Sequence, residues 1–298
     1  MSLDPDRILK SVRKVEKFIK KAPHQPTPEQ VHDLRTHARK LESAMHALSL
    51  DSNSEVRELL KDLKKVRSRA GKIRDMDVLT GHVCSVKVNG EQDCEIQLLE
   101  HLAIRRRKQA KKLHATVLKQ SAALKKELEQ AGDELKGLFR PTDGRPSEAA
   151  AEAMAHAVQL SSELSLPTRL TRSNLHPYRL KVKELRYVLQ MADGNGQPGF
   201  VKALGEVKDT IGEWHDWEEL IAITNDVLDH GPGCGLLRKF KEISEKKYER
   251  ALTLANQVRK RYIRTSANKK SNHSGFGLSR GVLAATSALG SQASKQAA

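Results

Sequence analysis

Apolar residues recur every three or four positions along nearly the whole chain. This spacing is typical of amphipathic α-helices, because one helical turn contains about 3.6 residues. No segment shows the sustained alternation of apolar and polar residues, bounded by hairpin turns, that predicts a half-buried β-strand. The sequence therefore predicts an all-α fold.

Turn-forming residues and changes of periodicity divide this pattern into separate predicted helices. In the first half of the chain we expect helices at residues 4–21, 28–48, 54–72 and 74–85, and a long one from 91 to about 132–137. In the second half we expect helices at residues 147–164, 175–192, 199–212, 215–228 and 236–264. Two of these predicted boundaries, at Gly71 and Gly212, rest on the helix-breaking tendency of glycine. Residues 265–298 are rich in Ser, Ala and Gly and contain no acidic residue, which predicts a disordered tail.

Two sequence motifs occur twice, in the same order. LHPYRLKVKELRYVLQ, which begins at Leu175, aligns with VHDLRTHARKLESAMH, which begins at Val31. GEWHDWEEL, from Gly212, aligns with GKIRDMDVL, from Gly71, and the copies are separated by 144 and 141 residues. A repeated order at a nearly constant offset indicates a duplicated unit. We therefore expect one domain over residues 1–264, built from halves at about 1–138 and 147–264. Each half would be an antiparallel bundle of about four helices, and the two bundles would be pseudo-symmetric around a basic groove or cavity.

Both copies of the first motif place polar and basic residues on one face of a helix and apolar residues on the opposite face. In the first copy the polar face comprises His32, Arg35, Arg39, Ser43 and His46, which lie within about 60° of one another around the helix axis. In the second copy it comprises His176, Arg179, Lys183, Arg186, Tyr187 and Gln190. An ordinary surface helix offsets such charges with acidic residues one turn away. Here the acidic residues lie off the polar face or at its edge. Because this polar face occurs in both copies of the motif, we favour an anion-binding surface over a solvated one.

Further basic rows occur on the helices predicted at 54–72 and from 91 onward. The first row contains Lys64, and the second contains His101 and the cations that follow it at helical spacing. Together with His46, these rows supply the secondary binding candidates, namely His46, Lys64, His101, Arg105, Lys108 and Lys112.

The charge balance of the chain points to an anionic partner. Lys and Arg number 53 against 37 Asp and Glu, which gives a formal net charge of +16. Such an excess predicts binding to nucleic acid, an acidic membrane surface or a polymeric phosphate. Aromatic residues make up only 4% of the chain, which argues against a single-stranded nucleic-acid binder that stacks bases on aromatic rings.

No secretory signal and no apolar run of about 20 residues is present, so we expect a cytoplasmic protein without a membrane partner. The three cysteines form no CxxC pair, and we interpret them as structural thiols in a reducing compartment.

Motifs for metal-dependent or nucleophilic catalysis are missing from the sequence. The histidines show no HExxH spacing, and Arg neighbours would repel a metal ion, so we expect neither a metal nor another cofactor. Asp75 and Asp216 follow the predicted breaks at Gly71 and Gly212. There they would stabilise the start of a new helix through its dipole and orient neighbouring cations. The sequence thus favours a binding protein over an enzyme.

The repeated motifs resemble the conserved histidine α-helical domain, or CHAD domain. They read V-H-D-L-R-x-x-x-R-K-L, R-D-M-D-V-L, L-H-x-x-R-x-x-x-K-x-L-R-Y and G-x-x-H-D in chain order, and the resemblance covers about residues 1–264. It implies two helical bundles around a basic cavity that binds inorganic polyphosphate. Such domains occur alone or beside triphosphate tunnel enzymes, and some associate with polyphosphate granules. The remaining residues have no room for a tunnel enzyme, so we expect a stand-alone member.

The resemblance also implies a set of ligand-binding residues. These are His32, Arg35, Arg39, Lys40 and Arg74 in the first half and His176, Arg179, Lys183 and Arg186 in the second. Two positions depart from the family pattern: Glu42 stands where a basic residue is common, and His215 aligns with Arg74. We expect the affinity to fall steeply with salt and to rise modestly below about pH 7 as histidines become protonated.

Two alternative functions remain open from the sequence. The same basic faces would suit a protein that binds nucleic-acid backbones, for which a flat or convex surface is expected. The chain could also serve as an adaptor that recruits a polyphosphate-metabolising enzyme. A concave groove between the two repeats would favour the polyphosphate interpretation.

Overall fold

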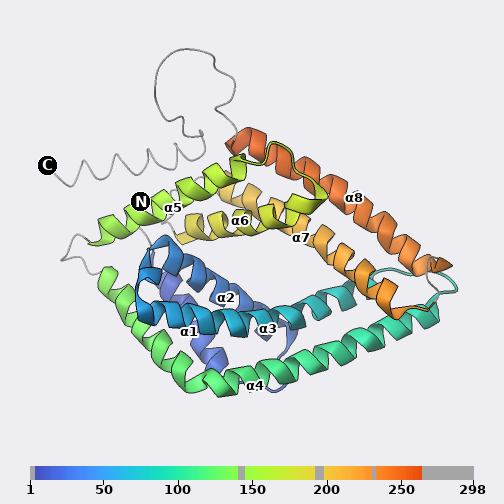
Figure 1. The fold of residues 1–298 in the computed structure, drawn as a ribbon, viewed down its shortest axis with the longest axis horizontal. Helices are drawn as coiled ribbons and strands as arrows, with labels where there is room; N and C mark the ends of the chain where they lie inside the picture. Colours follow the sequence, from blue (N-terminus) through green and yellow to red (C-terminus); the bar gives the residue numbers. More distant parts are fainter. Residues whose placement is uncertain (1–3, 140–144, 192–197, 230–232, 264–298) are drawn as a thin grey trace, which may run out of the picture.

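The fold is known from a computed structural model, which describes residues 4–139, 145–191, 198–229 and 233–263. These residues form helices and contain no strand, so the predicted all-α class is confirmed (Figure 1). The helices are α1 (Pro5–Lys21), α2 (Pro28–Ala47), η1 (Leu50–Ser52), α3 (Ser54–Cys84), α4 (Gln92–Leu138), α5 (Arg145–Ser165), α6 (Arg172–Met191), α7 (Pro198–Val227), α8 (Gly235–Val258) and η4 (Arg259–Ile263). The predicted disordered tail at 265–298 lies outside the described residues.

Helix starts in the first half follow local capping signals. The Asp4 side chain accepts a hydrogen bond from the backbone N–H of Arg7, which satisfies a free donor at the start of α1. Thr27 and Gln30 form a reciprocal capping box at the start of α2, with a proline at its first position. These starts agree with the predicted ones because the signals lie within a few residues of sequence.

The predicted breaks at Gly71 and Gly212 are wrong. Both glycines lie inside uninterrupted helices, α3 and α7. A glycine inside a helix costs only about 0.5–1 kcal/mol relative to alanine. This cost is too small to end a helix whose neighbouring residues, such as Ile73 and Ile211, are fully buried.

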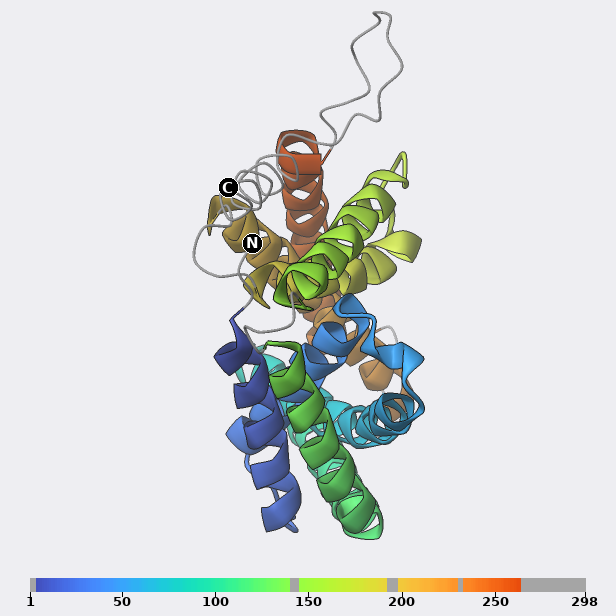
Figure 2. The same cartoon turned by 90° about the vertical axis from the view of Figure 1, so that its left-hand side faces the viewer.

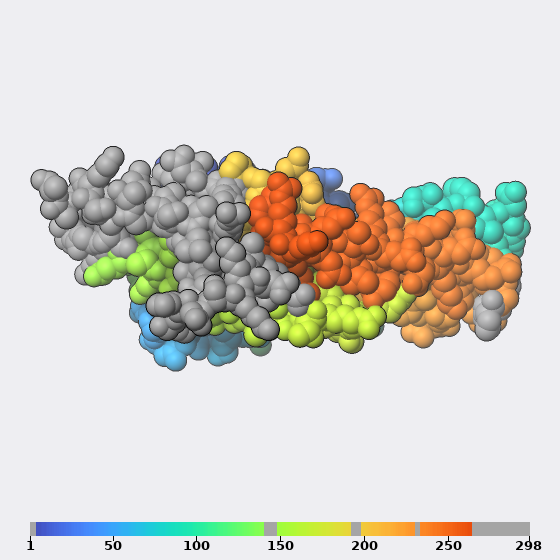
Figure 3. Space-filling view, turned by 90° about the horizontal axis from the view of Figure 1, so that it is seen from above, coloured from blue at the N-terminus to red at the C-terminus, as the bar shows by residue number. Residues whose placement is uncertain are grey.

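Helices consecutive in the chain pack against each other within each half. In the first half α1 packs on α2, α2 on α3 and α3 on α4, and α4 returns to contact α1. In the second half α5, α6, α7 and α8 pack in the same order, and η4 returns to contact α5. The two halves lie one above the other in Figure 2, and α2 contacts α6 between them. Seen from above, α8 runs along one face, and α4 emerges beside the start of α8 at one end (Figure 3).

The hydrophobic core consists of two clusters, and each contains residues from both halves. The larger includes Leu41 of α2, Leu185 of α6 and Trp214 of α7. The smaller lies where α3 and α4 meet α7 and α8, and it includes Leu98 and Trp217. The core therefore joins the two halves, and the two tryptophans belong to it.

The described helices are amphipathic, with buried apolar residues on one side and charged residues on the other. None of them, including the 47-residue α4, has a stretch apolar enough to cross a membrane.

Candidate anion-binding site

The polar faces of α2 and α6 meet charged residues of α3 and α7. Arg35 and Arg39 are four residues apart on α2, as are Arg179 and Lys183 on α6, so each pair shares one side of its helix. Their charges influence one another and those of further groups on α3 and α7. We call this set the central cluster, which comprises Arg35, Arg39, Arg74, Arg179, Lys183, Lys208, Asp75, Asp216 and Glu219.

Arg35 is held by the helix that follows its own. Its Nη1 donates hydrogen bonds to the carbonyl oxygen of Gly71 at 3.2 Å and to Oδ1 of Asp75 at 3.3 Å. A Cβ atom at position 71 would lie 3.9 Å from Cζ of Arg35, so the guanidinium packs directly on the glycine. Asp75 therefore orients a neighbouring cation, as predicted, but from the middle of a helix and not from its start.

Arg179 repeats this arrangement in the second half with a closer approach. Its Nε donates a hydrogen bond to the carbonyl oxygen of Lys208 at 3.0 Å. A Cβ atom at position 212 would lie only 2.6 Å from its Nη2, which is a clash. The role of Gly212 is thus to admit the Arg179 guanidinium to the surface of α7.

Lys183 lies at the centre of the positive charge. Burial lowers the pKa of its ammonium to about 7, and the charges of Arg39, Arg179, Arg35 and Lys208 act in the same direction. Two of these four cations come from α2, one from α6 and one from α7. A protonated Lys183 is therefore poorly compensated by the protein, and a bound anion would stabilise it.

Three carboxyl groups face the same cations. Burial raises the pKa of Asp216 to about 6 against the opposing effect of Arg179, and the charges of Asp75 and Glu219 raise it further. The pKa values of Asp75 and Glu219 are also raised, in each case mainly by burial. Two further acids pair with cations of the cluster, because Asp209 lies 2.6 Å from Nζ of Lys208 and Glu42 lies 3.1 Å from Nη1 of Arg39. The sequence indicates Asp75 and Asp216 as acids that orient neighbouring cations, but it does not identify Glu219 or Lys208, which lie on α7 and not on the basic faces of α2 and α6.

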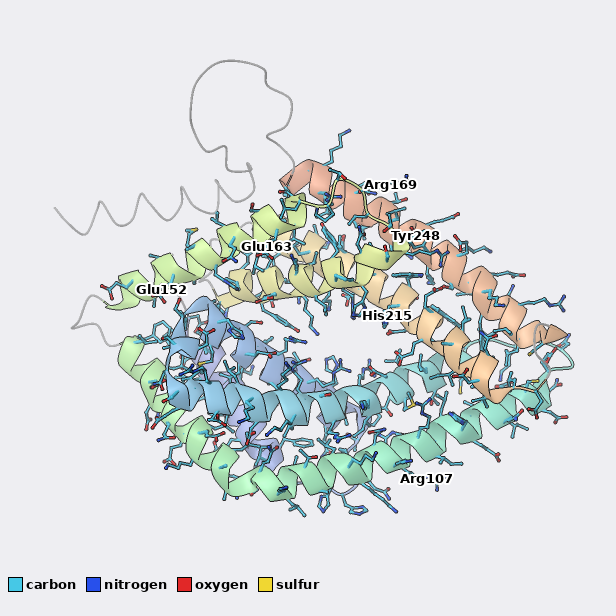
Figure 4. All side chains as sticks on the ribbon, in the orientation of Figure 1. Arg107, Glu152, Glu163, Arg169, His215 and Tyr248 are labelled. Atoms are coloured by element: carbon cyan, nitrogen blue, oxygen red, sulfur yellow. The ribbon has the colours of Figure 1, made fainter. Side chains whose placement is uncertain are left out.

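Two histidine rings lie in tilted contact at the edge of the central cluster. The ring centroids of His176 and His215 are 4.1 Å apart, and Figure 4 shows His215 pointing into the space between α3 and α7. Burial, together with His215 and Arg179, lowers the pKa of His176 to about 4. Burial and Arg179 also lower the pKa of His215. His176 is therefore neutral at physiological pH, whereas its counterpart on α2, His32, is exposed.

The low pKa of His176 changes the expected pH dependence. Protonation of His176 near pH 7 does not occur, because its pKa lies more than two units lower. A rise in affinity near and below pH 7 therefore has to come from other groups, such as Lys183, whose pKa is about 7.

Glu42 neutralises two arginines at the edge of the cluster. Its Oε2 lies 3.1 Å from Nη1 of Arg39 and 3.2 Å from Nε of Arg67, and its side chain is only 15% exposed. Arg67, on α3, also donates from Nη2 to Oε1 at 3.2 Å. Glu42 stands where a basic residue is common in the family pattern, and it is thus matched by Arg67, a cation outside the motif.

Lys40 lies on a different side of α2 from the central cluster. It lines a cavity of about 490 Å³ between α1, α2 and α6. The other charged or titratable residues of this lining, which we call the lateral cavity, are Arg7, Lys10, Lys14, Asp33, His37 and Tyr187. Burial lowers the pKa of Lys40, and Arg186, Lys10 and Arg7 lower it further. Arg186 is therefore close to Lys40, and its Nε lies only 3.2 Å from the position of a Cβ at Gly205.

The secondary candidates are scattered. Lys64, Arg105, Lys108 and Lys112 are exposed, and Arg105 is close enough to lower the pKa of Glu219. Nδ1 of His46 lies 3.0 Å from a carboxylate oxygen of Asp51 in the next turn. Burial and Arg105 lower the pKa of His101. Only Arg105 of this set is brought to the central cluster by the described interactions.

The sequence of this chain matches the family model of the CHAD domain over residues 6–224. Because the match covers most of the chain, the protein belongs to the CHAD domain family. No curated protein matches the chain at a significant level.

Two solved structures share its fold. One is the crystal structure of the CHAD domain from the plant Ricinus communis, with a TM-score of 0.58 and 18% identity over 86% of this chain and 88% of that one. The other is PptA from Streptomyces chartreusis, with a TM-score of 0.52 and 17% identity over 87% of this chain and 100% of that one. At these identities the likeness concerns the fold.

Proposed function

We propose that this protein binds inorganic polyphosphate at the central cluster and does not transform it. The observation that carries the proposal is Lys183, a half-buried cation surrounded by four others and held at a pKa of about 7. A site that concentrates positive charge at this cost is expected to bind an anion of high charge density. The CHAD family is linked to polyphosphate binding, which favours this anion over others.

The chemistry of the cluster suits a phosphate chain. Each phosphate carries about one negative charge, and binding to several cations releases the counterions of the chain, as for nucleic-acid backbones. Arg35 and Arg179 present planar guanidinium groups that can hold phosphate oxygens with two hydrogen bonds. Lys183 acts between them as a point charge, and Asp75 keeps Arg35 in place.

The repeated arrangement of the two halves supports a symmetric site. Arg35 packs on Gly71 as Arg179 packs on Gly212. Each arginine also donates a hydrogen bond to a backbone carbonyl of another helix in its own half, α3 for Arg35 and α7 for Arg179. We infer that the two halves are related by a pseudo-twofold axis and enclose a basic groove between α2 and α6. A flexible chain bound there would contact both halves at once. In the cell the protein would then associate with polyphosphate granules in the cytoplasm.

Competition distinguishes polyphosphate from a nucleic acid. The experiment measures how well unlabelled polyphosphate, duplex DNA, RNA and short phosphates each displace labelled long-chain polyphosphate from the protein at one fixed salt concentration. We expect polyphosphate to compete far better per charge than either nucleic acid. Equal competition per charge would replace the proposal with general binding of phosphate backbones.

A double variant locates the site. Arg35→Ala combined with Arg179→Ala should weaken polyphosphate binding and lower its salt dependence, because fewer counterions are released. Arg107→Ala is the matched control, since Arg107 is exposed on α4 and points away from the space between the halves (Figure 4). Equal affinities of the double variant and the control, with both proteins folded by circular dichroism, would remove the central cluster from the site.

A further inference from the structure

The connection between α3 and α4 meets the start of α8 at one end of the molecule (Figures 1 and 3). Cys94 lies in the first turn of α4, and Cys234 directly precedes α8. Their exposed fractions are 3% and 1%, and Glu91 lies half-buried beside them. One donor atom from each of the three residues lies within 4.8 Å of the other two. The cysteines are far apart in sequence, so no local motif predicts this cluster.

The distances within the cluster suit a tetrahedral metal ion. Sγ of Cys234 lies 3.4 Å from Oε2 of Glu91. A zinc ion with Zn–S and Zn–O distances of about 2.3 and 2.1 Å would place a sulfur and an oxygen ligand roughly 3.6 Å apart at the tetrahedral angle. Replacement of the thiol proton by the metal would therefore require little movement of either side chain.

The second oxygen of Glu91 is already held in position. Oε1 accepts a hydrogen bond from the backbone N–H of Gly235 at 2.6 Å, at the start of α8. Such a contact to the non-ligating oxygen orients a metal-binding carboxylate. The partial positive charge at the N-terminus of α8 also favours the negative charge that two thiolates and a carboxylate would bring.

The donor set selects the kind of metal. Mg²⁺ and Ca²⁺ prefer sites made of oxygen ligands, whereas thiolates favour softer ions. Zn²⁺ accepts sulfur and carboxylate oxygen together in four-coordinate sites. The buried setting among Leu98, Leu236 and Leu237 would protect the thiolates from solvent.

We propose that Glu91, Cys94 and Cys234 form a Zn²⁺ site that joins the start of α4 to the start of α8, with water as the fourth ligand. Binding exchanges two thiol protons, which are released to solvent, for one zinc ion, and neither sulfur is oxidised. The site is remote from the basic faces of α2 and α6 in the chain and independent of the proposed function. Its role would be to fasten the two halves together at this end.

The first test uses Co²⁺ as a spectroscopic substitute for zinc. The full-length chain is freed of metal by a chelator, kept reduced with a reductant that contains no thiol, and titrated with Co²⁺. We expect sulfur-to-cobalt charge-transfer absorption and the visible bands of tetrahedral Co²⁺, saturating at one ion per chain and lost on addition of Zn²⁺. Cys94→Ser and Cys234→Ser should each abolish the charge-transfer band. Cys84→Ser is the matched control, because Cys84 is the exposed cysteine, and it should leave the band intact.

A second measurement needs no variant. X-ray absorption at the zinc edge of the zinc-loaded wild-type protein should give two sulfur and two oxygen neighbours. Neighbours that are all oxygen or nitrogen would overturn the proposal, even if the serine variants failed to fold. It would also fail if fully reduced wild-type protein gave no charge-transfer band, or if Cys84→Ser removed the band as completely as Cys234→Ser.

Discussion

The guanidinium group of Arg179 lies directly on the backbone of Gly212. A Cβ atom at position 212 would stand 2.6 Å from Nη2 and 2.9 Å from Nε of this arginine. The matching pair in the first half is looser, because a Cβ atom at Gly71 would lie 3.9 Å from Cζ of Arg35. The two glycines of the repeat therefore differ in how strictly they are required.

Gly212→Ala should weaken polyphosphate binding without unfolding the protein. The added methyl group displaces Arg179, whose hydrogen bond to the carbonyl of Lys208 holds it in the cluster. Partial loss of one charge-assisted contact should lower the affinity roughly five- to tenfold. Titration with labelled polyphosphate measures this change.

Gly71→Ala is the control for that substitution. It should keep the affinity and raise the free energy of unfolding by up to about 1 kcal/mol, since alanine favours a helix interior more than glycine does. The steric argument fails if Gly212→Ala binds as tightly as Gly71→Ala while Arg179→Ala binds weakly.

Binding should depend on pH through Lys183. An anionic ligand favours the protonated lysine, so the affinity should fall as the pH rises above 7, with uptake of protons on binding. Calorimetry at pH 8 in buffers of different ionisation enthalpy measures this uptake. Lys183→Met should remove most of the uptake and the pH dependence between pH 7 and 9. Equal proton uptake by the wild type and this variant would assign the effect to another group.

The same lysine should make the protein more stable as the pH rises above 7, whereas it makes binding weaker. Its pKa in the folded protein, about 7, lies below the ordinary value of 10.5, so the unfolded chain binds more protons between these values. Lys183 therefore makes the free energy of unfolding of the wild type increase as the pH rises from 7 towards 10.5 and decrease as the pH falls. Lys183→Met should be more stable than the wild type at pH 7, with a difference that shrinks by pH 10. Urea unfolding at both pH values compares them.

Lys40 should matter less for polyphosphate than Lys183. It lines the lateral cavity and not the central cluster, and salt screens charges over about 8 Å at physiological ionic strength. We expect Lys40→Met to change the affinity by less than about twofold at this salt concentration. The same substitution at Lys183 should lower the affinity roughly tenfold or more, because it removes a charged contact. Equal losses would indicate that the ligand also occupies the lateral cavity.

Glu42→Gln should lower stability, because it removes the negative charge shared by Arg39 and Arg67. The three side chains are at most 29% exposed, so the loss should be about 2 kcal/mol. Glu58→Gln is the control, since its ion pair with Lys61 is about 60% exposed on both sides and should contribute little. Thermal unfolding of the two variants compares them, and equal melting temperatures would contradict the structural role of Glu42.

Local patterns along the chain were sufficient for the all-α class, for several helix starts and for the basic faces of α2 and α6. Helical periodicity and capping residues act within a few positions of sequence, so the start of α2 at its capping box could be predicted without any tertiary contact. Arg35 and Arg179 could be chosen for the same reason, because their face recurs in both copies of the motif.

Contacts between segments that are distant in the chain determined the features that local patterns did not predict. Gly71 and Gly212 have the same local signature as helix breakers, and the burial of neighbouring residues such as Ile73 and Ile211 against other helices explains why the helices continue. The acids of the central cluster, the position of Lys40 in another cavity and the meeting of Cys94 with Cys234 likewise depend on how helices far apart in the chain pack together. Periodicity determines which side of a helix is buried, but it carries no information about which other helix lies opposite. Packing therefore determined the pKa values of Lys183 and His176, because burial and neighbouring charge exist only in the folded chain.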